Sequence, residues 1–258
     1  MKFSNNFNDK NLIVILAVFG RSGSTLLQRI FNIRKETMIW GEHRGEIRTI
    51  YNIQQSLINT LNNVGRKQNE KYFNDKNEPY NNLIQDIIPE EKYIKKAIKG
   101  SIKSFIENLY SKDLNRYDTI GFKELRYNIN HINILKEIYP DINLIFLVRN
   151  PIDIYKSVLG YFPHDIDFFI EQWNNHVESF IELEKLGYPF IKYEDIINKD
   201  KKTLDIICNM AKIDKNMLFK VLNKKIGSTS QDISNEQKIY IINNCFKNMK
   251  KLNYKIKL

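Results

Sequence analysis

An unbroken apolar run leads directly into a glycine-rich loop near the N-terminus. Residues 12–19 are all apolar, residues 20–25 read Gly-Arg-Ser-Gly-Ser-Thr, and apolar residues return at 26–27 and 30–31. A continuous apolar run of this length is typical of a buried strand, and the spacing that follows it is typical of a helix. The pattern therefore predicts a strand, a tight loop and a helix in succession.

The same alternation continues along the rest of the chain. Strands that alternate with helices favour a parallel sheet joined by right-handed crossovers. We therefore expect one α/β domain over residues 1–258, three-layered and P-loop-like, with a central, mostly parallel sheet flanked by helices and a helical insertion around residues 46–115. The predicted strands lie at residues 12–19, 37–40, 118–122, 142–148 and 189–192, and the predicted helices at residues 26–31, 46–63, 90–109, 131–138, 165–186, 199–212, 216–222 and 234–251, with one more beginning at residue 151.

Two segments add detail to this pattern. Asn150 suits a helix N-cap and Pro151 the first helical position, so a helix is expected to begin there. The segment from Gly65 to Tyr80 is polar and charged, which predicts a surface loop, with a mobile lid as the alternative. The inner face of the helix after Pro151 is expected to carry Ile152, Tyr155, Val158 and Leu159.

Composition and charge narrow the function classes. Lys and Arg outnumber Asp and Glu by 40 to 30, a formal net charge of +10, but acidic residues lie between the basic ones along the chain. This distribution favours a solvated basic surface over a nucleic-acid footprint. No Arg/aromatic RNA-binding pattern is present, so we expect no nucleic-acid partner.

The cysteines and the N-terminus indicate a cytoplasmic protein without metal. Cys208 and Cys245 lie in apolar helical patterns, without a CxxC motif or histidines at metal-ligand spacing, so both are expected in the core. Lys2 precedes an apolar segment, but Asp9 and Lys10 interrupt it and it ends in a glycine loop rather than a cleavage site. No other segment approaches the length of a membrane span.

The glycine-rich loop has the chemistry of an anion site. Gly20 and Gly23 allow a tight turn before a helix N-terminus, where backbone N–H groups attract anions. The Lys that precedes Ser or Thr in a nucleoside triphosphatase loop is missing, which disfavours an ordinary ATP or GTP. Capping of the helix is a second role for Ser24 and Thr25. Further donors come from Arg21, Ser22, Ser24 and Thr25.

A second basic motif is expected at the same edge of the sheet. Arg149, Asn150 and Pro151 follow a predicted strand, and Ser157 lies nearly two turns into the next helix, on its polar side. Ligands of parallel α/β sheets bind beyond the carboxyl ends of the strands, where both motifs lie. Arg149 and Ser157 are therefore candidates to hold one phosphate, and the first loop another.

Together these motifs resemble those of sulfotransferases. Residues 20–27 resemble the 5′-phosphosulfate loop of that family, and residues 149–157 resemble its 3′-phosphate motif. Weaker similarities lie at residues 41–42, 121–124, 193–195 and 225–229. The Arg form of the first loop is similar to that of bacterial and Golgi members. The cytosolic small-molecule branch has Lys where Arg21 stands, and its catalytic His has no match here.

The resemblance implies an enzyme and a donor. It implies transfer of a sulfuryl group from 3′-phosphoadenosine 5′-phosphosulfate (PAPS), without metal, to an acceptor hydroxyl of a small metabolite, a glycan or a tyrosine. A P-loop nucleotide kinase or NTPase, and a non-enzymatic anion- or nucleic-acid-binding module, are the alternatives. The implied donor-binding residues are Arg21, Ser22, Gly23, Ser24, Thr25, Arg149, Ser157, Lys225 and Ser228, with Lys224 as a further candidate.

The resemblance also assigns catalytic candidates. Glu42 matches the catalytic Glu of the family and is the candidate base, with a surface ion pair to Arg44 as its alternative role. His43 is the rival base. Lys123, together with Arg21, is the candidate for contact with the transferring sulfonate or the leaving oxygen, the alternative being an ion pair with Glu124 or Glu42. Three aromatic residues, Trp173, Tyr193 and Phe190, suit either base stacking or, by preference, the core.

Overall fold

The computed structural model describes residues 2–74, 85–161, 165–224 and 230–255. The chain folds into two compact units. Unit 1 comprises Met1–Arg44 and Tyr110–Leu258, and unit 2 comprises Gly45–Leu109. Every described strand lies in unit 1, and the described elements of unit 2 are helical.

Unit 1 is built on a sheet of five described strands: β1 (Asn11–Ala17), β2 (Thr37–Trp40), β3 (Thr119–Glu124), β4 (Asn143–Val148) and β5 (Phe190–Lys192). The order across the sheet is β2-β3-β1-β4-β5, and each strand is parallel to its neighbours. β1 therefore lies in the centre, with Leu16 beside Glu124 of β3 and Ala17 beside Leu147 of β4. All five strands end at one edge, where the loops that follow them meet.

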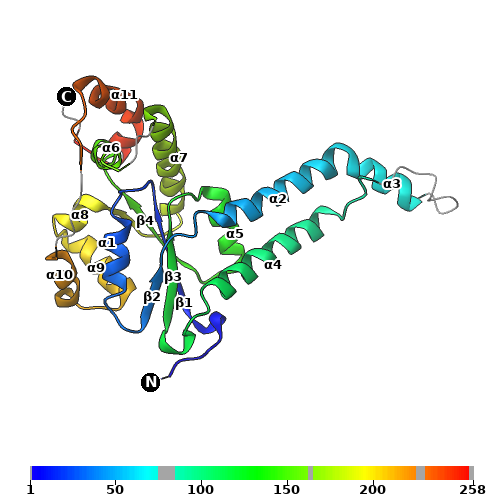
Figure 1. Ribbon diagram of the computed structural model, residues 1–258, viewed down its shortest axis with the longest axis horizontal. Helices are drawn as coiled ribbons and strands as arrows, with labels where there is room; N and C mark the ends of the chain where they lie inside the picture. The colour runs from blue at the N-terminus through cyan, green and yellow to red at the C-terminus, as the bar shows by residue number, and fades with distance from the viewer. Residues whose placement is uncertain (1, 75–84, 162–164, 225–229, 256–258) are drawn as a thin grey trace. The chain divides into compact units, whose positions relative to one another are not determined.

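Helices cover both faces of this sheet (Figure 1), which confirms the expected three-layer α/β architecture. α1, α8, α9 and α10 lie on one face, while α5 and α7 lie on the other. α6 and α11 pack against α7 and against each other. The bounds are α1 (Ser24–Phe31), α5 (Ile129–Ile138), α6 (Pro151–Leu159), α7 (Ile166–Glu184), α8 (Tyr193–Ile197), α9 (Lys201–Ala211), α10 (Lys215–Leu222) and α11 (Asn235–Lys251), with short 3-10 turns at Phe7–Asp9 and Leu114–Arg116.

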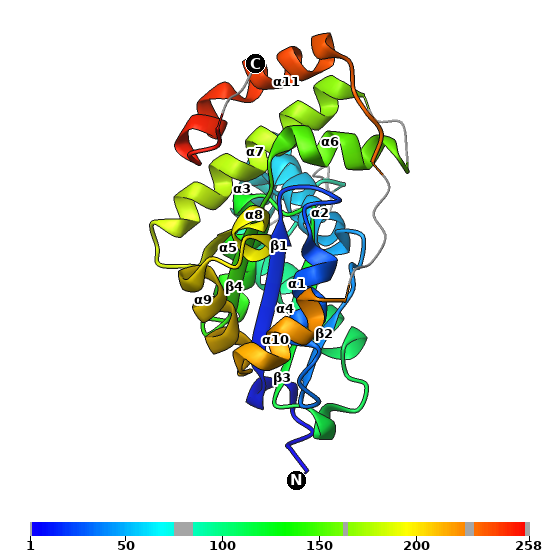
Figure 2. The ribbon, with the colours of Figure 1, turned by 90° about the vertical axis from the view of Figure 1, so that its left-hand side faces the viewer.

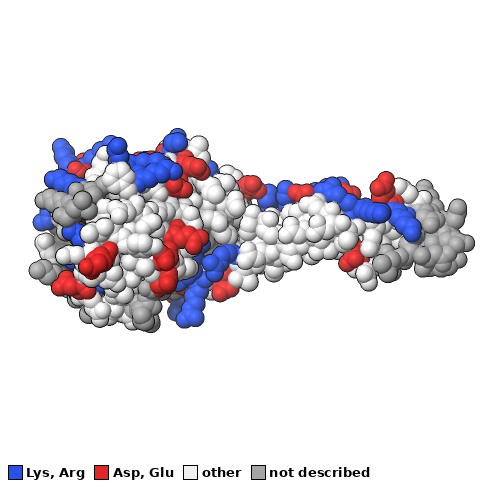
Figure 3. All heavy atoms as spheres, turned by 90° about the horizontal axis from the view of Figure 1, so that it is seen from above, with Lys and Arg blue, Asp and Glu red and all other residues white. Residues whose placement is uncertain are grey.

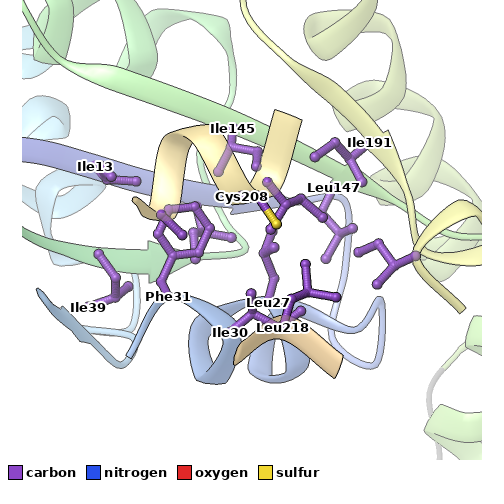
Figure 4. Close-up of a cluster of buried hydrophobic side chains, with 14 of the residues drawn as sticks. Ile13, Leu27, Ile30, Phe31, Ile39, Ile145, Leu147, Ile191, Cys208 and Leu218 are labelled. Atoms are coloured by element: carbon purple, nitrogen blue, oxygen red, sulfur yellow. The ribbon is translucent and has the colours of Figure 1, made fainter. Parts of the chain in front are cut away.

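The apolar runs of the sequence form the core between these layers. On the face seen in Figure 2, alternate residues of β1 and β4 pack against the inner sides of α1, α9 and α10. Cys208 is part of this cluster (Figure 4), and Cys245 is buried as well, so the core position expected for both cysteines is confirmed. On the opposite face, Phe146 of β4 stacks on Phe180 of α7 with 4.7 Å between ring centroids.

The described part of unit 2 is mainly helical. α2 (Glu46–Thr60) continues through a π-helical turn at Leu61–Gly65 into α3 (Arg66–Asn74), and α4 (Glu91–Leu109) runs beside α2. The buried residues of α4 recur every four positions, at Ile94, Ile98, Ile102 and Ile106. Figure 3 shows Lys and Arg side chains, with Asp and Glu between them, along one side of unit 2, next to a side with few charges.

Two details of the sequence prediction are wrong. The surface loop expected from Gly65 to Tyr80 is helical as far as Asn74, and periodicity gave no sign of α3 because none of its residues is buried, so it has no apolar face. The remainder of that segment lies outside the described residues. In α6, Ile154 is buried in place of Ile152 and Leu159, which are half-buried. Ser157, expected on the polar side of this helix, is buried.

Candidate functional site

The loop after β1 is folded tightly between strand and helix. Arg21 and Gly23 have positive φ angles of 66° and 95°. Ser22 is fully buried, and its Oγ donates a hydrogen bond to the carbonyl of Phe19 at 2.7 Å. α1 begins at Ser24, so its first backbone N–H groups face the loop without partners inside the helix. Such a strand–loop–helix arrangement suits an anionic group.

The structure brings the two basic motifs into contact. Arg21 Nε donates to Ser157 Oγ of α6 at 3.0 Å. Arg149, which follows β4, donates from Nη1 to the carbonyl oxygen of Arg21 at 2.9 Å. The guanidinium of Arg21 also lies over the ring of Tyr161, 4.2 Å from its centroid. Residues that stand 136 positions apart in the sequence therefore form one polar cluster.

Tyr193, the first residue of α8, links these two motifs. A Cβ atom at Gly23 would lie 2.2 Å from Tyr193 Cδ2, so only glycine leaves room for the ring there. On the same ring, the guanidinium of Arg149 lies 4.5 Å from the centroid. The neighbouring Glu194 accepts a hydrogen bond from the backbone N–H of Asn150 at 2.8 Å. Burial raises the pKa of Glu194, although its hydrogen bonds and the charge of Arg149 act in the opposite direction.

The hydrogen-bond donors of this cluster suit the oxygens of phosphate groups. Arg149 Nε is buried and has no hydrogen-bond partner among the described residues. A buried donor without a partner costs free energy, and an anionic ligand oxygen would supply the missing acceptor. Guanidinium groups bind phosphates through several charge-assisted hydrogen bonds, and Arg21 lies alongside.

α7 fixes the ends of the two strands that carry the motifs. Trp173 Nε1 donates to the carbonyl of Arg149 at 3.1 Å, and His176 Nδ1 donates to the carbonyl of Val18 at 2.9 Å. Burial lowers the pKa of His176. Trp173 is fully buried, which confirms its expected place in the core.

A second polar cluster lies at the ends of β2 and β3. Glu42 Oε1 accepts from Lys123 Nζ at 2.6 Å, and Glu42 Oε2 accepts from Arg126 Nη1 at 3.0 Å. The same Nη1 also donates to Glu124 Oε1 at 2.7 Å. The ion-pair partners of Glu42 are therefore Lys123, as in the alternative role given for that lysine, and Arg126, rather than Arg44, which was the alternative partner for Glu42. Burial raises the pKa of Glu42, but the hydrogen bonds and charges of these two cations outweigh it and hold the pKa below its usual range.

His43 turns away from Glu42 into a pocket of tyrosines. Its Nδ1 lies 2.8 Å from the hydroxyl of Tyr110, its Nε2 is hydrogen-bonded to the hydroxyl of Tyr127, and its ring packs edge-on against Phe122. The side chain is only 5% exposed. Both ring nitrogens are thus engaged by the protein, whereas Glu42 is 25% exposed.

The sequence prediction located most of this arrangement. Arg21, Arg149 and Ser157 meet in one cluster, Ser22 and Ser24 are buried, and Thr25 is exposed. Lys225 and Ser228 lie outside the described residues, and Lys224 is exposed.

Sequence reasoning missed Arg126 and the linking role of Tyr193. Arg126 lies only two residues beyond the end of β3, so its place at the strand-end edge was a usable signal. The ring of Tyr193 between Gly23 and Arg149 had no signal beyond a weak motif match.

The described residues offer neither a membrane span nor a metal cluster. Among them, no helix combines the length and apolar character that crossing a membrane requires. The same residues contain no group of three or more His, Cys, Asp or Glu side chains arranged to hold a metal ion.

Comparison with known proteins gives a family and a fold. Residues 13–216 match the sequence model of the sulfotransferase family. No curated protein matches the chain. The sulfotransferase domain of the Synechococcus PCC 7002 olefin synthase is 13% identical, with a TM-score of 0.52, and the match covers 100% of each chain.

Two further solved structures agree with this match. The sulfotransferase domain of the curacin biosynthetic pathway is 13% identical with a TM-score of 0.52, and the match covers 96% of this chain and 99% of that one. A sulfotransferase from Mycobacterium avium is 12% identical with a TM-score of 0.50, over 96% of this chain and 78% of that one. At such identities the likeness shows the fold.

Proposed function

Because the chain belongs to the sulfotransferase family, we propose that it transfers a sulfuryl group from PAPS to an acceptor hydroxyl. The observation that carries this proposal is the meeting of Arg21, Arg149 and Ser157 around the loop after β1, with Arg149 Nε buried and without a partner among the described residues. Two guanidinium groups, a hydroxyl and a helix N-terminus at one strand edge suit a nucleotide with phosphates at two positions.

The proposal assigns the two phosphate positions to the two motifs. Arg149 and Ser157 would hold the 3′-phosphate. The loop of Arg21, Ser22, Gly23, Ser24 and Thr25 would hold the 5′-phosphosulfate, mainly through its backbone N–H groups and the Arg21 guanidinium. Lys225 and Ser228 remain proposed contacts at the nucleotide. Because Ser22 Oγ already donates to Phe19, we expect its contribution to come from the backbone.

Catalysis would rest on fixed charge and on a base. The donor supplies an activated sulfuryl group whose leaving oxygen gains negative charge during transfer. Arg21 and Lys123 would stabilise that charge, because fixed cations in a site of low dielectric lower such a barrier strongly. Glu42 would accept the proton of the acceptor hydroxyl.

Glu42 suits the role of base better than His43. Both ring nitrogens of His43 are engaged by tyrosine hydroxyls, and its side chain is 5% exposed, while the carboxylate of Glu42 is more accessible. We propose that the whole chain works as one sulfotransferase domain in the cytoplasm. Its acceptor would be a small metabolite, a glycan or a tyrosine, and no metal or nucleic acid is required.

Thermal unfolding with nucleotides tests the donor assignment. A ligand at 100 times its Kd stabilises the native state by about 2.7 kcal/mol, which corresponds to a rise in Tm of roughly 5–10 °C for a chain of this size. We expect this rise with adenosine 3′,5′-bisphosphate, a smaller one with ATP and magnesium, and most of the rise to be lost in Arg149→Gln.

The matched control is Arg116→Gln, because Arg116 is 68% exposed and pairs only with its neighbour Asp113 among the ion pairs described. This control should respond to the nucleotide as the wild type does. A larger rise with ATP and magnesium would indicate a kinase or NTPase. No rise with either nucleotide, together with salt-sensitive binding to random DNA, would indicate a nucleic-acid-binding module.

A further inference from the structure

Arg126 lies between two carboxylates that differ in burial. Its Nη1 donates to Glu124 Oε1 at 2.7 Å and to Glu42 Oε2 at 3.0 Å. Glu124 is the last residue of β3, is fully buried, and accepts a second hydrogen bond from the backbone N–H of Leu125 at 2.8 Å. Glu42 lies in a loop and is 25% exposed. Arg126 therefore connects a loop carboxylate to an anchored one.

Each oxygen of Glu42 has its own cation. Oε1 is bound by Lys123 and Oε2 by Arg126, so removing one cation leaves the other contact in place. The two cations differ in character. Lys123 ends in a single ammonium on a flexible stem, whereas the planar guanidinium of Arg126 can keep two acceptors in a fixed relation. Lys123 is thus the cation that can turn to another anion.

From this arrangement we infer that Arg126 is the positioning residue of Glu42: it holds Oε2 against the Glu124 anchor, so that Glu42 stays in place when Lys123 leaves Oε1 for the transferring group. The inference rests on the proposed function in that it takes Glu42 as the base. Arg126 itself touches neither donor nor acceptor in this role. It acts through Glu42.

The charged groups around Glu42 give this arrangement a measurable signature. Lys123 and Arg126 face the carboxylate directly, Glu124 faces Arg126, and His43 Nε2 lies 3.9 Å from Glu124 Oε2. The two cations lower the pKa of Glu42 against the effect of burial. Loss of either charge should therefore raise that pKa in part, because the other cation remains, and loss of both should raise it further.

The experiment is a carbon-13 NMR titration of the Glu side-chain carboxyls in the protein without nucleotide. The Glu42 signal is assigned by its absence in Glu42→Gln. We expect its midpoint to rise in Arg126→Gln, to return most of the way in Arg126→Lys, and to be higher in Lys123→Met/Arg126→Gln than in Lys123→Met. Arg34→Gln is the matched control, because Arg34 forms a bidentate pair with Asp118 and not with Glu42. It should leave the midpoint unchanged.

Two results would overturn the inference: a wild-type midpoint in Arg126→Gln, or a midpoint in Lys123→Met that already equals that of the double variant. Should Arg126→Gln fail to fold, Arg126→Met replaces it, alone and combined with Lys123→Met, with the same expected and contrary results. In transfer assays, Arg126→Gln should lower kcat by about 10- to 100-fold through misplacement of the base. The titration needs neither donor nor acceptor, so a failure of the proposed function would not alter it.

Discussion

Both oxygens of Glu42 are bound to cations in this structure, through Lys123 at 2.6 Å and Arg126 at 3.0 Å. A carboxylate held in this way is a weak base, because its pKa lies below the usual range. Departure of Lys123 toward another anion would free Oε1 and raise that pKa at the same moment. The proposed base would therefore become competent only when the neighbouring lysine is engaged by the donor.

Replacement of Glu42 tests its role directly. Glu42→Gln removes the proton acceptor but keeps the size of the side chain and an oxygen that accepts hydrogen bonds. We expect sulfuryl transfer to fall by about 100-fold or more, while the Tm rise with adenosine 3′,5′-bisphosphate stays at the wild-type value. Transfer is measured as label incorporated from sulfur-35 PAPS into an extract of the source organism.

Glu36→Gln is the matched control for this substitution. Glu36 is 44% exposed and pairs with Arg34 at 3.6 Å, so the same chemical change there should leave transfer unaltered. Full transfer by Glu42→Gln would remove Glu42 as the base.

The sequence could identify residues that belong to a motif, but not the contacts that they make with distant residues. Arg21 and Arg149 were found because each belongs to a motif at the end of an apolar run. The contact between Glu42 and Arg126 joins positions 84 residues apart, and no local pattern reports such a distance. Ser157 was placed on the polar side of its helix because serine is polar. Its burial follows from the approach of Arg21, a tertiary contact that periodicity does not contain.

At the scale of elements, the loop after β1 depends on Gly23 in two ways. Its φ angle of 95° is one that L side chains rarely adopt, and a Cβ atom would lie 2.2 Å from Tyr193 Cδ2. Gly20 in the same loop has no heavy atom within 4 Å of the position of an added Cβ. The loop therefore has room for a Cβ atom at position 20 but not at position 23.

Alanine substitution at both positions tests whether the loop needs glycine at position 23 in particular. The Gly20 variant shows the effect of the same substitution where an added Cβ meets no other atom. We expect Gly23→Ala to lower the free energy of unfolding by about 1–3 kcal/mol, because strained backbone and a displaced tyrosine both act on the native state. Gly20→Ala should change it by less than about 1 kcal/mol. Chemical denaturation followed by circular dichroism measures both. Equal losses in the two variants would contradict the role given to Tyr193.

Elements with a buried stripe or a continuous apolar run were predictable. β2 was expected at residues 37–40 and occupies Thr37–Trp40, and α4 differs from its prediction by one residue. α3 lacks any buried residue, so its sequence shows no period. α8 spans only Tyr193–Ile197, directly after β5, and a helix of about one turn is too short to show a repeat.

At the scale of the whole molecule, the residues assigned to the nucleotide all belong to unit 1. Arg21 to Thr25, Arg149 and Ser157 lie within Met1–Arg44 and Tyr110–Leu258, as does Tyr193. Unit 2, Gly45–Leu109, has a narrow buried stripe of isoleucines and several exposed apolar side chains, among them Ile53 and Tyr93. Segments with few buried residues open more readily than the centre of a sheet.

The division into two units predicts how amide hydrogen exchange differs along the chain, both with and without nucleotide. We expect amides of α2 and α4 to exchange faster than those of β1 and β4 in the free protein, since local opening is easiest where burial is least. Adenosine 3′,5′-bisphosphate should slow exchange at residues 18–25, 149–158 and 193–194, because a bound ligand raises the free energy of openings that release it. Gly45–Leu109 should exchange as before. ATP with magnesium at the same concentration is the control and should protect the first of these segments less. Protection of α2 or α4 equal to that of the loop after β1 would contradict a nucleotide site built from unit 1 alone.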